Sequence, residues 1–235
     1  MSSLLWPVWL STAALQTYWQ SLYEPELASF QTLAVEEASG AVVGLANSIP
    51  FLRGEVLPGN GWDWVLEQGV LAARSGNPVN ALSALSVAIQ PAYRGTGLAQ
   101  RLLGAMKPPA LHAGLASMVA PVRPTLKASY PLQDFATYCS WRRADGTPFD
   151  PWLRTHEALG AKAIGPAMMS MTVTAPLAKW ESWTALRFPD NGSYAIAGGL
   201  APLEIANGHG SYIEPNLWME HPLERADYPG QHTAG

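Results

Sequence analysis

The chain has 235 residues, of which 48% are hydrophobic and 14% charged, and its formal net charge at pH 7 is −4. This length and composition indicate a globular protein with room for one large core, and they exclude a disordered chain. The small acidic net charge provides no basic surface for nucleic acid, so we expect no nucleic-acid partner.

The N-terminal segment is apolar from Leu4 to Leu10, but no Lys or Arg precedes Arg53. We therefore expect no secretory signal peptide, and no apolar run is long enough to predict a membrane span. Cys139 is the single cysteine, which excludes an intrachain disulfide and favours the reducing cytoplasm. A packed apolar group is the more frequent role for such a thiol, with a catalytic thiol as the alternative.

The first part of the chain predicts helices and strands from the spacing of its apolar residues. The expected elements are a helix over residues 11–23, a β-hairpin of residues 31–38 and 40–49, a helix over 61–75, and a buried strand over 82–89. A helix over residues 97–106 follows, and Lys107-Pro108-Pro109 is expected to stop or kink it.

A glycine-rich turn joins that buried strand directly to the helix over residues 97–106. It reads Gln90-Pro91-Ala92-Tyr93-Arg94-Gly95-Thr96-Gly97. The free N–H groups of such a turn converge at the helix N-terminus, where the helix dipole favours an anion. Gly95 and Gly97 lack the Cβ atoms that would hold a diphosphate away from the backbone, and Arg94 adds a positive charge.

This stretch resembles the acyl-CoA-binding motif of the GCN5-related N-acetyltransferases (GNAT), which reads Arg or Gln, two residues, Gly, one residue, then Gly or Ala. Here the motif stands as Arg94-Gly95-Thr96-Gly97-Leu98-Ala99. The resemblance implies that these six residues hold the diphosphate of acetyl-CoA or another acyl-CoA, which serves as co-substrate. It also implies that the backbone of Val87, Ala88 and Ile89 pairs with the pantetheine arm and supplies the donor to the thioester carbonyl. A plain strand–turn–helix with the same glycines is the alternative.

The second part of the chain is less regular. A strand over residues 117–122, a loop-rich segment over 123–150, a helix over 151–159 capped by Asp150, and a strand over 161–174 are expected. Beyond these, the pattern predicts helix near 180–183, short strands at 194–196 and 203–206, and a polar, Pro-rich tail after His221 that frays.

The order of these elements resembles the GNAT fold. It implies an α/β protein whose mixed, mostly antiparallel sheet is splayed at the acyl-CoA site and flanked by helices. We expect a single GNAT-like domain over residues 1–235, with a core over about residues 11–175. A C-terminal extension over residues 176–235 then completes the sheet, covers the pocket or forms a dimer contact.

The resemblance also implies candidates for proton transfer. The thiol acid in the family is a tyrosine on the helix after the fifth strand, which makes Tyr130 and Tyr138 candidates, although both equally fit buried aromatics. Thr125 and His156 resemble the Thr and His of the GNAT-like acyl-CoA decarboxylase domains of polyketide synthases. A histidine is well suited to proton transfer near neutral pH, and a surface or capping histidine is the alternative.

We expect no metal, because no His or Cys pair has ligand spacing and Gly160 stands where a zinc motif after His156-Glu157 needs its second histidine. The chain has 10 Trp residues, several in loop-rich parts. They predict either an apolar acceptor pocket or lid, or side chains that attach insertions to the core.

The leading hypothesis is therefore a cytoplasmic, acyl-CoA-dependent N-acetyltransferase that moves an acetyl group to an amine of a small or apolar acceptor. One alternative is a malonyl-CoA decarboxylase or S-acyltransferase that uses Thr125 and His156, and another is a non-catalytic acyl-CoA-binding module. The acceptor is expected to be a small molecule, with no membrane partner, and a homodimer is left open.

Overall fold

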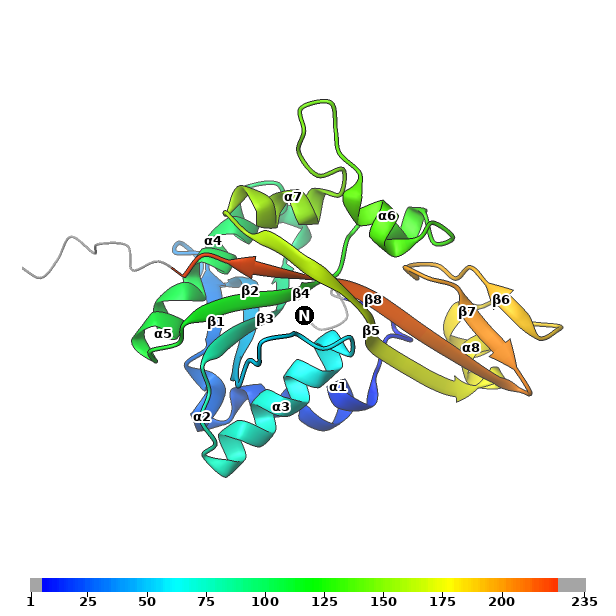
Figure 1. The fold of residues 1–235 in the computed structure, drawn as a ribbon, viewed down its shortest axis with the longest axis horizontal. Helices are drawn as coiled ribbons and strands as arrows, with labels where there is room; N and C mark the ends of the chain where they lie inside the picture. The colour runs from blue at the N-terminus through cyan, green and yellow to red at the C-terminus, as the bar shows by residue number, and fades with distance from the viewer. Residues whose placement is uncertain (1–5, 224–235) are drawn as a thin grey trace, which may run out of the picture.

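A computed structural model describes residues 6–223, and its centre is an eight-stranded sheet (Figure 1). The sheet order is β1-β2-β3-β4-β8-β7-β6, and β5 also pairs with β8. The strands are β1 (Gln31–Val35), β2 (Val42–Phe51), β3 (Ala81–Ile89), β4 (Ser117–Val122), β5 (Lys162–Pro176), β6 (Gly192–Tyr194), β7 (Leu203–Ala206) and β8 (His209–His221). Within this sheet only β3 and β4 run parallel, which confirms the expected mixed, mostly antiparallel α/β fold.

Helices cover both faces of the sheet. The α-helices are α1 (Ala13–Tyr18), α2 (Pro25–Ala28), α3 (Gly61–Ser75), α4 (Leu98–Ala105), α5 (Lys107–His112), α6 (Phe135–Ser140), α7 (Pro151–Ala158) and α8 (Leu177–Thr184). Among residues 6–223 there are also three short 3-10 helices, η2 (Trp19–Tyr23), η3 (Pro91–Tyr93) and η4 (Lys127–Ser129). Within residues 6–223, none of the helices has the length and apolar character needed to cross a bilayer.

Each face of the sheet has its own hydrophobic core. α3 lies on one side of the sheet and α4 and α7 on the other (Figure 1). Successive strand residues alternate between the two cores, as the period of two requires: Val119 packs in the α3 core, whereas Met118 and Ala120 pack in the α4 core. On β8, Trp218 and its neighbour Leu217 divide in the same way.

The local sequence signals located most elements well. The helix over residues 61–75 and the strands over 117–122 and 203–206 have their expected bounds. The helix expected over residues 11–23 is instead α1 followed by η2, and it ends at Glu24 because Pro25 forces an extended backbone on the residue before it. At Lys107-Pro108-Pro109 a new helix, α5, begins, since prolines are tolerated in a first helical turn.

β8 is the long strand that the sequence pattern did not reveal. It lies between β4 and β5, so residues after 176 complete the sheet (Figure 1). Pro215 argues against a strand in the sequence pattern, because proline seldom occupies a central strand. In the structure Pro215 stands opposite a bulge of β5 between Ala167 and Met171, where the ladder needs no N–H donor. Of the tail expected to fray after His221, residues 224–235 lie outside the described part.

Gly69 allows α3 to pack closely on β2. A Cβ at this position would lie 2.5 Å from Ile49 Cγ1 and 2.8 Å from the Pro50 carbonyl oxygen. We expect Gly69→Ala to lower the free energy of unfolding by about 1–3 kcal/mol, because the added methyl group overpacks the contact.

Urea unfolding of both Gly69→Ala and Gly104→Ala tests this packing. Gly104 lies in α4, and a Cβ there meets nothing within 4 Å. The control variant is expected to be neutral or more stable by up to about 1 kcal/mol, because alanine favours helix. Equal effects of the two substitutions would contradict the packing argument.

Candidate active site

The glycine-rich turn places free backbone N–H groups at the start of α4. Gly95 and Gly97 have φ angles of 77° and 81°, the left-handed backbone that glycine adopts without strain. A Cβ on either residue would meet no atom within 4 Å, so the backbone borders open space. In the described part of the chain, the N–H groups of residues 95–99 find no backbone acceptor. These groups suit an anion at the helix N-terminus.

A cavity of about 620 Å³ opens where β3 and β4 diverge. The two strands pair at only three positions, Ala81–Ser83 with Ser117–Val119, and beyond them residues 84–89 and 120–122 both line the cavity. The cofactor residues expected from sequence that line it are Val87, Ala88, Ile89, Arg94, Gly95, Gly97, Leu98 and Ala99. Thr96 does not line the cavity, and its hydroxyl donates to the Tyr93 carbonyl at 2.7 Å.

A β-bulge in β3 fixes a tryptophan at one end of this cavity. Leu85 is an extra residue of β3 relative to β2, and its carbonyl accepts a hydrogen bond from Trp62 Nε1 at 2.9 Å. Leu85 precedes Ile89 by four residues, or about 13 Å of strand. Trp62 and the glycine-rich turn therefore lie at opposite ends of the segment of β3 that lines the cavity.

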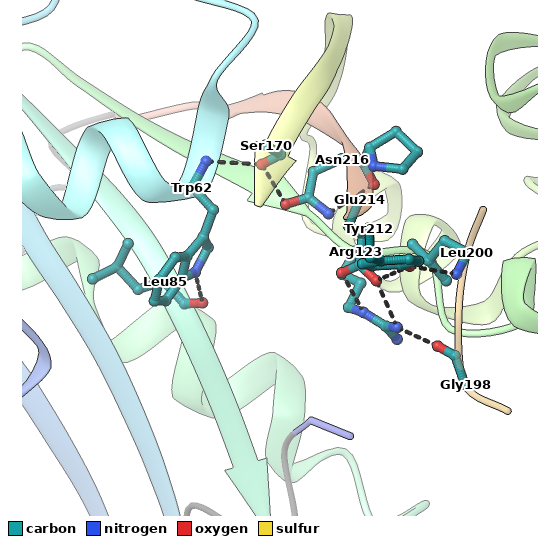
Figure 2. Close-up of polar contacts among 10 residues, drawn as sticks. Trp62, Leu85, Arg123, Ser170, Gly198, Leu200, Tyr212, Glu214 and Asn216 are labelled. Carbon is teal, nitrogen blue, oxygen red and sulfur yellow. Dashed lines mark hydrogen bonds and ion pairs between the residues drawn. The ribbon is translucent and has the colours of Figure 1, made fainter. Parts of the chain in front are cut away.

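Hydrogen bonds from β5 and β8 hold the same end of the cavity (Figure 2). The Trp62 backbone N–H donates to Ser170 Oγ at 2.8 Å, and Ser170 Oγ donates to Asn216 Oδ1 at 2.6 Å. Ser170 and Asn216 are buried, so this chain of bonds satisfies groups that water does not reach. Trp6, Met171 and Asn216 join Trp62 in the lining, which gives this end an apolar wall with one amide.

An ion pair stands beside the cavity (Figure 2). Arg123, which lines the cavity, donates to both oxygens of the buried Glu214 carboxylate at 2.7 and 2.9 Å. Burial lowers the pKa of Arg123, but the charge and hydrogen bonds of Glu214, together with Tyr212, raise that pKa above its usual value. Arg123 also donates to the Gly198 carbonyl at 2.6 Å, and the Tyr212 hydroxyl donates to Glu214 at 2.7 Å. The pair thus adds no net charge to the wall.

Thr125 and His156 both line the cavity, as expected from the sequence. Asp150 sets their relative position. One of its carboxylate oxygens caps α7, the helix of His156, by accepting two backbone N–H groups. The other oxygen accepts the N–H of Leu126, next to Thr125, at 2.7 Å and the Tyr138 hydroxyl at 2.8 Å. A single buried carboxylate therefore holds both candidate residues.

His156 is buried and contacts a second histidine. Its Nδ1 lies 2.8 Å from Nε2 of His221, the last residue of β8. Burial, and to a smaller extent His221, lowers the pKa of His156 to about 3. Burial and the charge of Lys107 lower the pKa of His221 to about 4. Both imidazoles are therefore neutral at physiological pH.

Tyr130 and Tyr138 lie outside the cavity lining. The Tyr138 hydroxyl donates a hydrogen bond to Asp150, and burial raises the pKa of Tyr138. Tyr130 packs with Tyr138 in an aromatic cluster that includes Trp141. Burial also raises the pKa of the neighbouring Cys139 thiol to about 12, which suits a packed group. Neither candidate tyrosine therefore joins Thr125 and His156 in the cavity lining.

The site residues that sequence reasoning missed come mainly from β5 and β8. They are Ser170, Met171, Tyr212, Glu214, Asn216 and His221. The run Leu217-Trp218-Met219 was the one local signal for a strand here. Trp6, Trp62 and Trp152 line the cavity, whereas Trp9, Trp180 and Trp218 are core residues. Residues 6–223 contain no group of three or more His, Cys, Asp or Glu that could hold a metal.

Comparisons with known proteins show the class to which the chain belongs. No family model matches the chain. A protein of Aspergillus versicolor named arginine N-acetyltransferase avaD is 32% identical over 250 residues, covering 94% of this chain and 86% of the relative. The loading GNATL domain of CurA from Lyngbya majuscula has a TM-score of 0.59 at 18% identity, over 90% of this chain and 86% of that one.

A further solved structure, the GphF GNAT-like decarboxylase in complex with isobutyryl-CoA, has a TM-score of 0.55 at 18% identity, over 94% of this chain and 91% of that one. The two structures are similar in fold. Together with the 32% identical relative, they show the class: the chain belongs to the GCN5-related N-acetyltransferase family. It is an acyl-CoA-dependent acyltransferase of the N-acetyltransferase type.

The buried histidines predict how stability depends on pH. An unfolded histidine binds a proton near pH 6.5, whereas folded His156 and His221 stay neutral to about pH 3 and 4. Each therefore lowers the free energy of unfolding by up to about 1.4 kcal/mol per pH unit as the pH falls below 6.5. Asp63 acts in the opposite sense, because burial raises its pKa to about 6 and the folded state binds its proton first.

Together, these three groups should lower the free energy of unfolding by roughly 1 kcal/mol per pH unit as the pH falls from 6 to 5. Urea unfolding at several pH values measures the slope. His156→Gln should flatten it, Asp63→Asn should steepen it, and His112→Gln, at an exposed position, is the matched control. An unchanged slope in His156→Gln would show that this imidazole is not held neutral.

Proposed function

We propose that this enzyme moves an acetyl group from acetyl-CoA to an amine of a small acceptor. The observation that carries the proposal is that one cavity is lined by the glycine-rich turn, by Val87–Ile89 and by His156. The turn offers N–H groups to the diphosphate, and the free edge of β3 offers backbone groups to the pantetheine arm. Arg94, exposed at the turn, adds a positive charge toward the same phosphates.

The chemistry requires one proton to move. The acceptor nitrogen attacks the thioester carbonyl carbon, the C–N bond forms, the C–S bond breaks, and the proton leaves nitrogen and reaches sulfur. Backbone N–H groups beside the Leu85 bulge stabilise the carbonyl oxygen as charge develops. His156 is the base we assign, because its ring lines the cavity and an imidazole is suited to proton transfer.

The far end of the cavity suggests the acceptor. Trp6, Trp62 and Met171 favour an acceptor with an apolar part, and Asn216 and Arg123 add polar contacts. The 32% identical relative is named as an arginine N-acetyltransferase, so arginine is the first amine to test, beside apolar primary amines.

Decarboxylation of malonyl-CoA is the second candidate function. It is favoured by the joint presence of Thr125 and His156 in the cavity, the two residues that this reaction would use. In that case malonyl-CoA loses CO₂ and takes up one proton to give acetyl-CoA, and no amine is consumed.

Thiol release from acetyl-CoA or malonyl-CoA, with and without a panel of amines, separates the two functions. We expect release from acetyl-CoA only when an amine is present, and N-acetyl product by mass. His156→Ala should lower kcat by about 10²- to 10⁴-fold because proton transfer is lost, whereas Thr125→Ala should stay near the native rate. Exposed His112→Ala is the control. Amine-independent conversion of malonyl-CoA that needs Thr125 would establish decarboxylation instead.

A substitution in the turn tests the cofactor site. Gly97→Val places a branched side chain where the diphosphate approaches. We expect the Kd for acetyl-CoA to rise about tenfold or more, which is a loss of at least about 1.4 kcal/mol of binding free energy. Titration calorimetry measures the change. Gly40→Val is the matched control, because Gly40 has a φ of 70°, equally open surroundings and a place in the β1–β2 turn. Equal affinity in Gly97→Val and the native enzyme would refute the assignment.

A further inference from the structure

The pair formed by His156 and His221 joins two parts of the chain that are 65 residues apart. His156 is on α7 and His221 is the last residue of β8, and they are 2% and 1% exposed. Their rings lie 5.0 Å apart between centroids. The rings of Trp152 and His156 are nearly perpendicular, with 4.7 Å between their centroids, and both residues line the cavity. The cavity therefore meets only one of the two imidazoles, His156.

The outer nitrogens of this pair have no partner. Within residues 6–223, His156 Nε2 and His221 Nδ1 are the buried side-chain polar atoms without a hydrogen bond. Leaving a buried polar atom unsatisfied costs about 1–3 kcal/mol. Two such atoms therefore lower the stability of the folded state, and the pair is not explained by a contribution to stability. His156 Nδ1 points to His221, which leaves Nε2 on the opposite side of a ring that lines the cavity.

We propose that His221 is a positioning residue whose Nε2 accepts a hydrogen bond from the Nδ1–H of His156, and so presents the Nε2 lone pair of His156 to the reacting amine. The inference rests on the proposed role of His156 as the base. In a neutral imidazole one nitrogen carries the proton and the other is the acceptor, so the partner of Nδ1 decides which state Nε2 has. A carboxylate has this role in other catalytic triads, and here a neutral histidine has it.

The proton balance follows from this arrangement. Nε2 of His156 takes the proton that leaves the acceptor nitrogen, and His156 becomes an imidazolium whose Nδ1–H donates to His221 Nε2. The proton on Nε2 then passes to the CoA sulfur as the C–S bond breaks, and the pair returns to its starting state. Lys107 is the charged group that acts on His221, and it lowers the pKa of His221.

Two substitutions at His221 separate a positioning role from a structural one. His221→Phe fills the space without an acceptor, and we expect kcat to fall by about 10- to 100-fold while the KM for acetyl-CoA stays unchanged. His221→Gln offers a carbonyl oxygen to Nδ1–H and should restore most of kcat. Exposed His209→Phe is the matched control.

The tautomer of His156 is read directly from ¹⁵N–¹H correlation spectra of the histidine-labelled full-length enzyme, assigned with His156→Gln. We expect the proton on Nδ1 in the native enzyme and in His221→Gln. A proton on Nε2 in the native enzyme, or native kcat in a folded His221→Phe, overturns the proposal. The spectrum is independent of turnover, so it still decides the tautomer if no amine supports thiol release and the proposed function itself fails. It also decides the matter if His221→Phe does not fold.

Discussion

The site depends on the short length over which β3 and β4 pair. They share three positions and then diverge, while β4 stays paired with β8 from Met118 to Val122 and β3 stays paired with β2 up to Ile89. Two strand edges are thereby left facing each other across a cavity. Unpaired backbone groups inside a protein need partners, and an extended, amide-containing arm such as pantetheine provides them. The gap in the sheet is thus where we propose that the pantetheine arm binds.

β8 makes this divergence possible and also supplies the site with polar groups. Its inward side chains include Glu214, Asn216 and His221, all at most 1% exposed. Each has a partner from a different element: Arg123 after β4, Ser170 in the β5 bulge, and His156 on α7. Buried polar groups are stable only when they are paired, so the contacts of Glu214 and Asn216 help to fix the register of β8.

The sequence predicted the elements and the cofactor half of the site because their signals are local. A strand, a turn with Gly95 and Gly97, and a helix are contiguous, and each has a pattern of a few residues. Asp150 could likewise be read as a helix cap. β8 could not be read, because Pro215 and the inward polar residues remove the alternation that marks a strand. Its partners lie far away in the chain, and no local pattern encodes them.

The two halves of the cavity therefore differ in how they are built. The turn and the end of β3 are one continuous segment, while the end that we propose for the acceptor is assembled from the N-terminus of α3, a bulge of β5 and the middle of β8. A change in Ser170, Met171 or Asn216 reshapes the acceptor wall without touching the turn. Under the proposed function, cofactor binding and acceptor choice are therefore physically separable in this fold. A relative with 32% identity can share the transfer chemistry, while its acceptor has to be established from the acceptor wall itself.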